Sequence, residues 1–250
     1  MKTMIKMVFV FLIFSFGVLY VYAGEWRDEF DKADLNKDWI KITDRPAKLT
    51  TIKIEKGRLL MYEQTANFGH LIVDGRPLIL RKAPKGNFSI SMLVDTIPPA
   101  PAADYWLGLF IIGQDGNDAV LAQNWAVLTI GGSKGEKKTL IGSMIDSTWN
   151  DKGHFDVKGW PIYLKLEKSD TTYTGYYKEK PDDQWTKVGD SWKHEMKAPE
   201  LVGMGFINNW GGTKVTMVAE YFSLEGDNVS PMAVQAKGKI TDTWGNIKSK

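Results

Sequence analysis

Residues 161–189 read PIYLKLEKSDTTYTGYYKEKPDDQWTKVG, and this stretch decides the fold class. In its first part, residues 162–167, apolar residues alternate with polar or amphipathic ones, which is the period of a half-buried β-strand. Ser169-Asp170 then turns the chain, and residues 171–177 return as a strand rich in Thr and Tyr. A second turn at residues 181–183 leads into a short third strand. The stretch predicts consecutive antiparallel strands and contains no catalytic group.

The same short-range alternation recurs along most of the chain, with Gly, Pro, Asn and Asp between the segments. No helical period of useful length appears before the C-terminus, although residues 33–37 are expected to form one helical turn. Many short strands with such turn signals are typical of a two-sheet antiparallel sandwich. Strands are expected at residues 25–30, 39–42, 51–55, 58–62, 69–73, 78–82, 88–94, 105–113, 119–123, 126–130, 139–145, 162–167, 171–177, 184–188, 202–207 and 214–224.

Four motifs occur in an order that matches one known superfamily. The first motif is DEFD at residues 28–31, followed by Leu35 and Trp39, and the second is LGLF at 107–110. The third is the Leu-x-Leu-x-Lys … Tyr-Tyr … Trp-x-x-Val-Gly hairpin within 161–189. The fourth is a closing pair of strands, VGMGF at 202–206 and AEYFSL at 219–224. Together they resemble the concanavalin A-like lectin/glucanase superfamily, in its LamG-like and β-xylosidase C-terminal-like form. The resemblance covers about residues 25–224 and implies an all-β, jelly-roll sandwich of two antiparallel sheets, of a non-catalytic type.

The first residues have the pattern of an export signal. Lys2 and Lys6 precede an apolar run from Met7 to Tyr20, and Val21-Tyr22-Ala23 fits a small-residue cleavage site. Cleavage after Ala23 is expected, and the alternative is an uncleaved anchor. We therefore expect three parts: a signal peptide at 1–23, the sandwich at 24–224, and a linker with a short tail at 225–250. The protein is expected to be secreted, extracellular or periplasmic, with no membrane contact after cleavage.

Composition excludes several classes of function. The whole chain has 32 basic and 30 acidic residues, and removal of the first 23 residues takes away two lysines. The resulting balance, with no basic run, argues against a nucleic-acid partner. There is no cysteine, so an exported chain must hold together through its core alone, and thiol catalysis and Cys-metal sites are excluded.

Catalysis on this fold would require two carboxylates on one face, about 5–5.5 Å apart in a retaining glycosidase. Apart from Glu25 and Glu29 in the first expected strand, no expected strand carries acidic residues two or four positions apart. His70, His154 and His194 lack metal-ligand spacing, and no nucleophile-elbow motif occurs. The sequence therefore favours a protein that is not an enzyme. A carboxylate pair assembled from loops remains an alternative.

The resemblance also implies a structural calcium ion between the first and last strands. Asp28 and Glu29 are the nearest match to such a site, because hard oxygen ligands suit calcium. The other interpretation, which the small number of ligands favours, is a solvated strand end. No other cofactor is indicated.

Aromatic residues next to amides are the stronger functional signal. A sugar ring binds by stacking its C–H face on an aromatic ring while a neighbouring amide bonds its hydroxyls. Trp106 and Phe110 share the strand face opposite Leu107 and Leu109, so both faces of that strand are apolar, and either a second layer or a ligand must cover it. Any single Trp can equally be core, as is expected of Trp39 and Trp185. The predicted ligand-binding residues are Trp106, Gln123, Asn124, Trp125, Asn208, Asn209 and Trp210.

These observations predict an exported carbohydrate-binding or surface-adhesion module without catalytic activity, whose partner is a glycan or polysaccharide. Two alternatives remain: a glycoside hydrolase or related sugar-processing enzyme with its carboxylates in loops, and a structural or protein-interaction domain.

Overall fold

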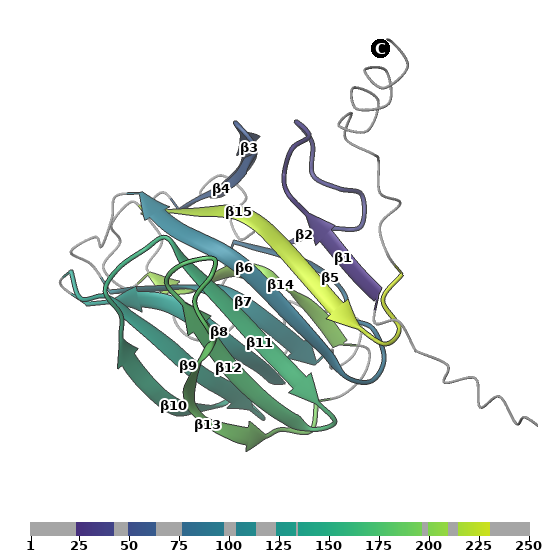
Figure 1. Cartoon of the computed structure of the whole chain (residues 1–250), viewed down its shortest axis with the longest axis vertical. Coiled ribbons are helices and arrows are strands. Elements are labelled where there is room, and N and C mark those ends of the chain that lie inside the picture. Colours follow the sequence, from purple (N-terminus) through teal and green to yellow (C-terminus); the bar gives the residue numbers. More distant parts are fainter. Residues whose placement is uncertain are drawn as a thin grey trace, which may run out of the picture.

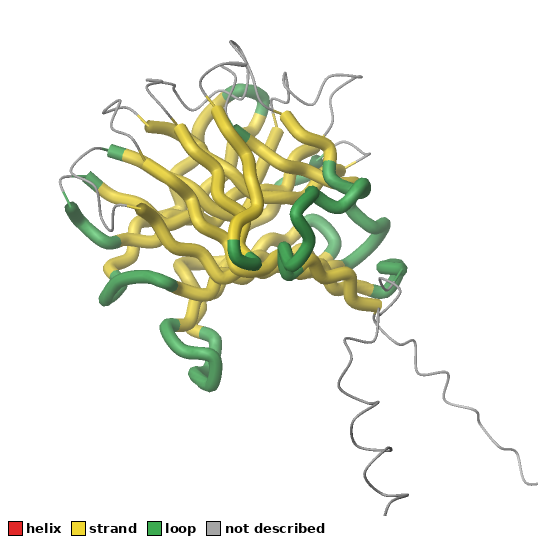
Figure 2. Tube along the Cα trace, turned by 90° about the horizontal axis from the view of Figure 1, so that it is seen from above, coloured by secondary structure: helices red, strands yellow, loops and turns green. Residues whose placement is uncertain are grey.

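The computed structural model shows a sandwich of two antiparallel sheets, called A and B here. Figure 1 looks onto sheet A with sheet B behind it, and Figure 2 shows that strands make up most of the described chain. No residue of this described part is helical, which agrees with the all-β prediction. The structure describes residues 24–42, 50–63, 77–97, 104–113, 124–133, 135–196, 200–209 and 215–230.

Sheet A has eight strands, and the hairpin that decided the fold class lies in it. The strand order is β13-β12-β11-β6-β15-β4-β3, and β1 pairs with β15 beyond the end of β4. The strands are β13 (Thr186–Lys193), β12 (Thr172–Lys178), β11 (Ile162–Ser169), β6 (Phe88–Ile97), β15 (Val215–Gly226), β4 (Arg58–Glu63), β3 (Thr50–Glu55) and β1 (Gly24–Asp28).

Sheet B has seven strands in the order β10-β9-β8-β7-β14-β5-β2. Its strands are β10 (Thr148–Asp156), β9 (Lys138–Ile145), β8 (Asn124–Gly132), β7 (Tyr105–Gly113), β14 (Glu200–Asn209), β5 (Leu78–Lys82) and β2 (Ile40–Ile42). Strand β7 has the predicted bounds, and β8 and β14 begin two residues earlier than expected.

The deciding hairpin has the predicted alternation. Leu164 and Leu166 of β11 are buried between the sheets, whereas Tyr163 and Lys165 on the other face are half-buried. The turn lies one residue later than expected, because Ser169 pairs with Thr172. Asp170 takes the positive φ of 53° in this turn, a conformation that Asp tolerates better than most residues.

Two local predictions were wrong, and two lie outside the described residues. Strand β10 was not expected, because its sequence TWNDKGHFD lacks alternation; as an edge strand that pairs only with β9, it does not need a buried face. Residues 33–37 form bends and a turn instead of a helical turn, and the Asn36 side chain accepts a bond from the Asp38 N–H at 3.0 Å. The strands expected at 69–73 and 119–123 lie outside the described residues.

The central strands of sheet B are buried on both faces, whereas the edge strand β10 has no fully buried residue. Its inner face joins sheet A in the main core, which includes Leu107, Leu109 and Leu128. Its outer face forms a second apolar cluster, called the outer cluster here, of Leu78, Leu80, Trp106, Phe110, Ile112, Trp125, Val127, Leu140, Met144, Leu201 and Ile207. The sequence-based interpretation of β7 as apolar on both faces is therefore confirmed.

The ends of the chain give two further facts. Strand β15 continues to Gly226, and Val229 is buried against the main core, so chain beyond residue 224 still packs on the sandwich. The expected signal peptide at 1–23 and residues 231–250 lie outside the described part, in which no helix is long and apolar enough to cross a membrane.

Candidate functional site

The structure places Trp106 and Trp125 together in the outer cluster of sheet B. Trp106 is 7% exposed, and Trp125 is 0% exposed, so neither offers an open ring face. Trp125 packs between Phe110 and Trp149, with ring centroids 6.0 and 5.4 Å away. A covered indole contributes to stability by burial, as a core residue does.

Two glycines explain how these indoles lie against the sheet. A Cβ on Gly131 would come within 2.9 Å of the Trp106 ring, and one on Gly142 would come within 2.5 Å of the Trp149 ring. Each ring therefore packs directly on a strand backbone that has no side chain at that point. Trp106 also meets His154 edge-on at 5.0 Å, and His154 bonds Asp151 at 2.7 Å.

The predicted ligand-binding residues include two amide–indole tripeptides, Gln123-Asn124-Trp125 and Asn208-Asn209-Trp210, whose described residues lie at opposite ends of β7. Asn124 pairs with Gly113 at one end of β7, whereas Asn209 pairs with Tyr105 at the other end. Strand β7 also separates β8 from β14, so the strands that carry the two tripeptides are not neighbours in sheet B.

The amide residues can be placed only in part. Of the predicted ligand-binding set, Asn208 is the cross-strand partner of Trp106. Gln123 and Trp210 lie outside the described residues, and only the backbones of Asn208 and Asn209 are described. The binding roles of the seven residues stay predictions.

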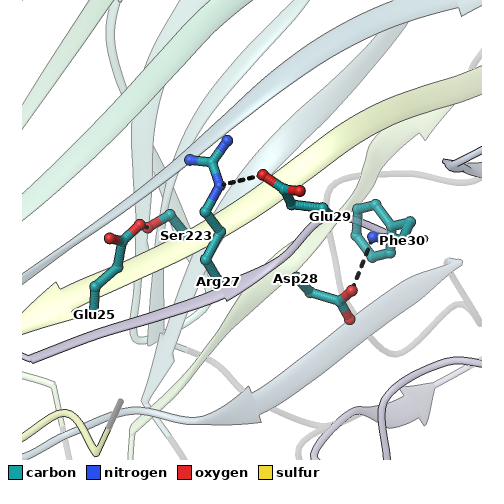
Figure 3. A network of polar contacts seen from close by, with 6 residues as sticks. All are labelled: Glu25, Arg27, Asp28, Glu29, Phe30 and Ser223. Carbon is teal, nitrogen blue, oxygen red and sulfur yellow. Dashed lines mark hydrogen bonds and ion pairs between the residues drawn. The ribbon is translucent and has the colours of Figure 1, made fainter. Parts of the chain in front are cut away.

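The predicted calcium ligands take part in protein contacts (Figure 3). The buried carboxylate of Asp28 accepts bonds from the Phe30 N–H at 2.9 Å and from Trp39 Nε1 at 2.8 Å. Glu29 turns the other way, toward Arg27 Nε at 3.3 Å. Within the described ranges no group of three His, Asp or Glu residues is arranged to hold a metal ion. Calcium binding at this strand end stays a prediction.

Sheet A carries the half-exposed aromatic residues. Tyr221 on β15, Tyr163 on β11, Tyr176 on β12 and Trp185 after β12 form what we call the aromatic row, on the outer face of the sheet. Leu93 of β6 pairs with both Tyr163 and Tyr221, whose centroids are 6.4 Å apart. From β15 to β12 there are three strand spacings of about 4.8 Å each, so the row extends about 14 Å.

Cations lie between the rings of the aromatic row. The Arg27 guanidinium lies 3.8 Å from the centroid of Tyr221. The Lys178 ammonium is 5.1 Å from Tyr163 and 5.0 Å from Trp185. Lys165 is also 5.0 Å from Trp185 and is 4.7 Å from Tyr176. These contacts hold the rings in place by cation–π attraction.

Two Trp residues were expected in the core, and the prediction is confirmed for Trp39 but wrong for Trp185. Trp39 packs edge-on against Trp26 and Phe222, at 5.3 and 5.1 Å. Trp185 precedes β13 on the outer side of sheet A, where it is half-exposed and lies 5.0 Å from the ammonium groups of Lys165 and Lys178. The sequence signal for this was present in the turn residues 181–183, since a Trp next to a turn need not face the core.

A polar pocket of about 380 Å³ lies at one end of the sandwich, and we call it the end pocket. It forms where β8 begins and where β9 and β13 end. Its walls are Asn124, Ile145, Asp146, Thr171, Lys193, His194 and Glu195. Asn124 is thus the predicted ligand-binding residue that lines the end pocket. No sequence pattern indicated the other six residues, because they come from three separate segments of the chain, 145–146, 171 and 193–195.

His194 is the buried titratable group of the end pocket. It is 3% exposed, and its Nε2 lies 3.2 Å from Asn124 Oδ1. Burial lowers the pKa of His194, against an opposing effect of the nearby Asp146 carboxylate. The imidazole is therefore neutral at neutral pH.

Comparison with known proteins identifies the fold. No family model matches the chain, and no curated protein is similar to it in sequence. Among solved structures, a xylan β-1,4-xylosidase from Bacillus halodurans matches with a TM-score of 0.64 and 17% identity, and the Bacteroides ovatus xyloglucan GH43B protein with 0.62 and 18%. Each match covers 80% of this chain, but only 38% of the xylosidase chain and 39% of the GH43B chain. The chain has the concanavalin A-like sandwich fold.

One matching structure has a size similar to this chain. The CBM2 module of the evolved Dit from Lactobacillus casei phage J-1 matches with a TM-score of 0.52 and 10% identity, over 84% of this chain and 99% of the module. At such identities the comparisons establish the fold and do not transfer residue roles.

Trp125→Ala is expected to destabilise the sandwich by about 3–5 kcal/mol, because it empties a fully buried indole site. Urea denaturation of the variant measures this. Trp185→Ala is the matched control and is expected to cost much less, since that ring is half-exposed. Loss of ligand affinity with an unchanged free energy of unfolding would instead assign Trp125 to a ligand.

His194 is expected to make stability depend on pH. Its pKa is lower in the folded chain than the ordinary 6.5, so the unfolded chain binds the proton first and the free energy of unfolding falls as the pH drops below about 6.5. His194→Gln removes this pH-dependent contribution to stability. The difference in melting temperature between the unmodified protein and the variant should therefore become smaller from pH 7.5 to pH 5.5. Burial raises the pKa of Glu200, so this residue changes the free energy of unfolding with pH in the opposite direction. Both proteins contain Glu200, so its effect cancels in the difference between them. A difference that widens on acidification would contradict the prediction.

Proposed function

We propose that this protein is a non-catalytic carbohydrate-binding module that holds a polysaccharide on the outer face of sheet A. The observation that carries the proposal is the aromatic row, whose rings are half-exposed and lie side by side across β12, β11 and β15. An exported chain would use such a face for attachment to a polysaccharide or for surface adhesion.

Sugar chemistry fits this face well. Pyranose rings present apolar C–H groups that stack on aromatic faces, and hydroxyl rims that need hydrogen bonds. The row offers four rings, and the charged groups of Arg27, Lys165 and Glu167 lie among them. Lys165 and Glu167 are only 2.7 Å apart, so a donor and an acceptor are available at one place for a hydroxyl pair.

The comparisons support the class of ligand. The matching xylosidase and GH43 proteins are named for sugar-processing activities, and this chain matches about two fifths of their lengths. The CBM2 module shows that the same fold occurs as a module of similar size. A module that binds polysaccharide without cleaving it agrees with both.

Replacement of row residues is expected to weaken polysaccharide binding. Trp185→Ala and Tyr163→Ala should each lower affinity by about tenfold, the equivalent of about 1.4 kcal/mol of lost stacking. Affinity electrophoresis in gels containing xylan, xyloglucan or β-glucan measures this. Tyr62→Ala is the matched control, because Tyr62 is also a half-exposed tyrosine of sheet A but lies outside the row. Equal binding by all three variants would exclude the row as the site.

A sugar-processing enzyme is the alternative, and one acidic pair makes it testable. Glu25 on β1 and Glu225 on β15 are direct cross-strand partners, and both are exposed on the outer face of sheet A. Directly opposite residues have Cβ atoms about 4.5–5.5 Å apart, which overlaps the separation of about 5–5.5 Å between carboxyl groups in retaining glycosidases. Glu25 also accepts a bond from the Ser223 hydroxyl at 2.9 Å.

We expect no release of reducing sugar from these polysaccharides and none of nitrophenol from aryl xylosides. An exposed pair lacks the apolar surroundings that raise the pKa of a general acid. Turnover that Glu225→Gln abolishes, with binding retained, would show that the alternative is correct.

A further inference from the structure

The end pocket is built from segments that meet at one end of the sandwich. Asn124 is the first residue of β8, Asp146 follows β9, and His194 follows β13. Thr171 lies in the turn between β11 and β12, and its carbonyl accepts the His194 N–H at 2.9 Å. The pocket volume of about 380 Å³ falls within the range of about 300–1,000 Å³ that is typical of small-ligand sites.

The hydrogen bonds of Asn124 fix the orientation of its amide. Its Nδ2 donates to Asp146 Oδ1 at 3.3 Å, and its Oδ1 accepts from the Asp146 N–H at 3.1 Å. Because Oδ1 is an acceptor, the contact of 3.2 Å to His194 requires that Nε2 carry the hydrogen. The proton of the neutral imidazole is thereby assigned to Nε2.

This tautomer leaves His194 Nδ1 as a bare acceptor. The atom is buried and has no hydrogen-bond partner in the described part of the chain. A buried polar atom without a partner is costly in a folded protein, unless a ligand or water supplies one. His194 is part of the pocket wall, but Nδ1 itself is buried, so the exposed wall groups make the first contacts with a ligand.

The remaining wall groups define the ligand chemistry. Asp146 and Glu195 are acceptors, whereas the Lys193 ammonium and the Thr171 hydroxyl are donors. An anionic ligand would be repelled by the carboxylates of Asp146 and Glu195. A metal ion is not indicated either, because the described residues do not form a metal site. A neutral molecule with adjacent hydroxyls uses donors and acceptors together, because each hydroxyl both donates and accepts. Ile145 adds an apolar surface for C–H groups.

We propose that the end pocket is a second sugar site, which binds a single sugar unit through adjacent hydroxyls. This proposal rests on the proposed carbohydrate-binding function, but it uses different residues. The pocket and Trp185 lie at opposite ends of the β12–β13 hairpin, since Tyr173 pairs with Trp192 near the pocket and Tyr177 pairs with Thr186 near Trp185. The two sites can therefore be tested separately.

The test is titration of the full-length protein with methyl glycosides of xylose, arabinose, galactose and glucose, followed by calorimetry and by saturation-transfer NMR. At least one glycoside should bind, and Glu195→Gln and Thr171→Val should each weaken it by about tenfold, the effect of one lost hydrogen bond to a charged or buried group. Glu195 is exposed and its replacement should leave the melting temperature unchanged, so a loss of binding is not a loss of folding. Trp185→Ala is the control and should leave glycoside binding intact.

The outcomes separate this proposal from the function proposed above. Glycoside binding that Glu195→Gln weakens and Trp185→Ala does not supports the end pocket, whether or not polysaccharides bind. The absence of binding by all four glycosides overturns the end pocket, even if polysaccharides bind the aromatic row. Binding that is unchanged in both pocket variants overturns it as well.

Discussion

The burial of sheet B on both faces is the constraint from which the functional surfaces follow. An antiparallel sheet usually packs one face on the core and leaves the other to solvent. In this protein Phe110 and Trp125 are completely buried on the face of sheet B that points away from sheet A. Trp106 and Trp125, two of the indoles that the sequence analysis selects for ligand binding, therefore contribute to packing. The outer face of sheet A carries half-exposed aromatic residues, which form the aromatic row.

Cation–π contacts with arginine and lysine hold the rings of the aromatic row in place. Its rings stand on alternate positions of strands that are rigid because their inner residues, such as Leu164 and Phe222, fill the main core. Lysine and arginine groups lie 3.8–5.1 Å from the centroids of these rings. A sugar that stacks on such rings also meets donors at its edge, so the same contacts that hold the row serve recognition.

The chain has no disulfide, and polar bonds at the strand ends take part of that role. Asp28 joins the end of β1 to Phe30 and to the indole of Trp39 through two bonds to one buried carboxylate. In the end pocket Asn124, Asp146 and His194 join β8, β9 and β13 in a similar way. The first network uses both carboxylate oxygens within the protein. The second leaves one buried acceptor, which is why it resembles a binding site.

The sequence by itself determined the fold class and most strands, because alternation with period two and turn residues are local signals. It determined the two apolar faces of β7, since Trp106 and Phe110 are visible in the pattern. Local signals could not reveal β10, whose edge position removes the need for apolar residues. Only the tertiary structure decided that Asn124 meets His194, 70 residues away, and that the two amide–indole tripeptides lie at opposite ends of β7. Strand order is set by the global packing of the sheets, and no segment of the sequence records it.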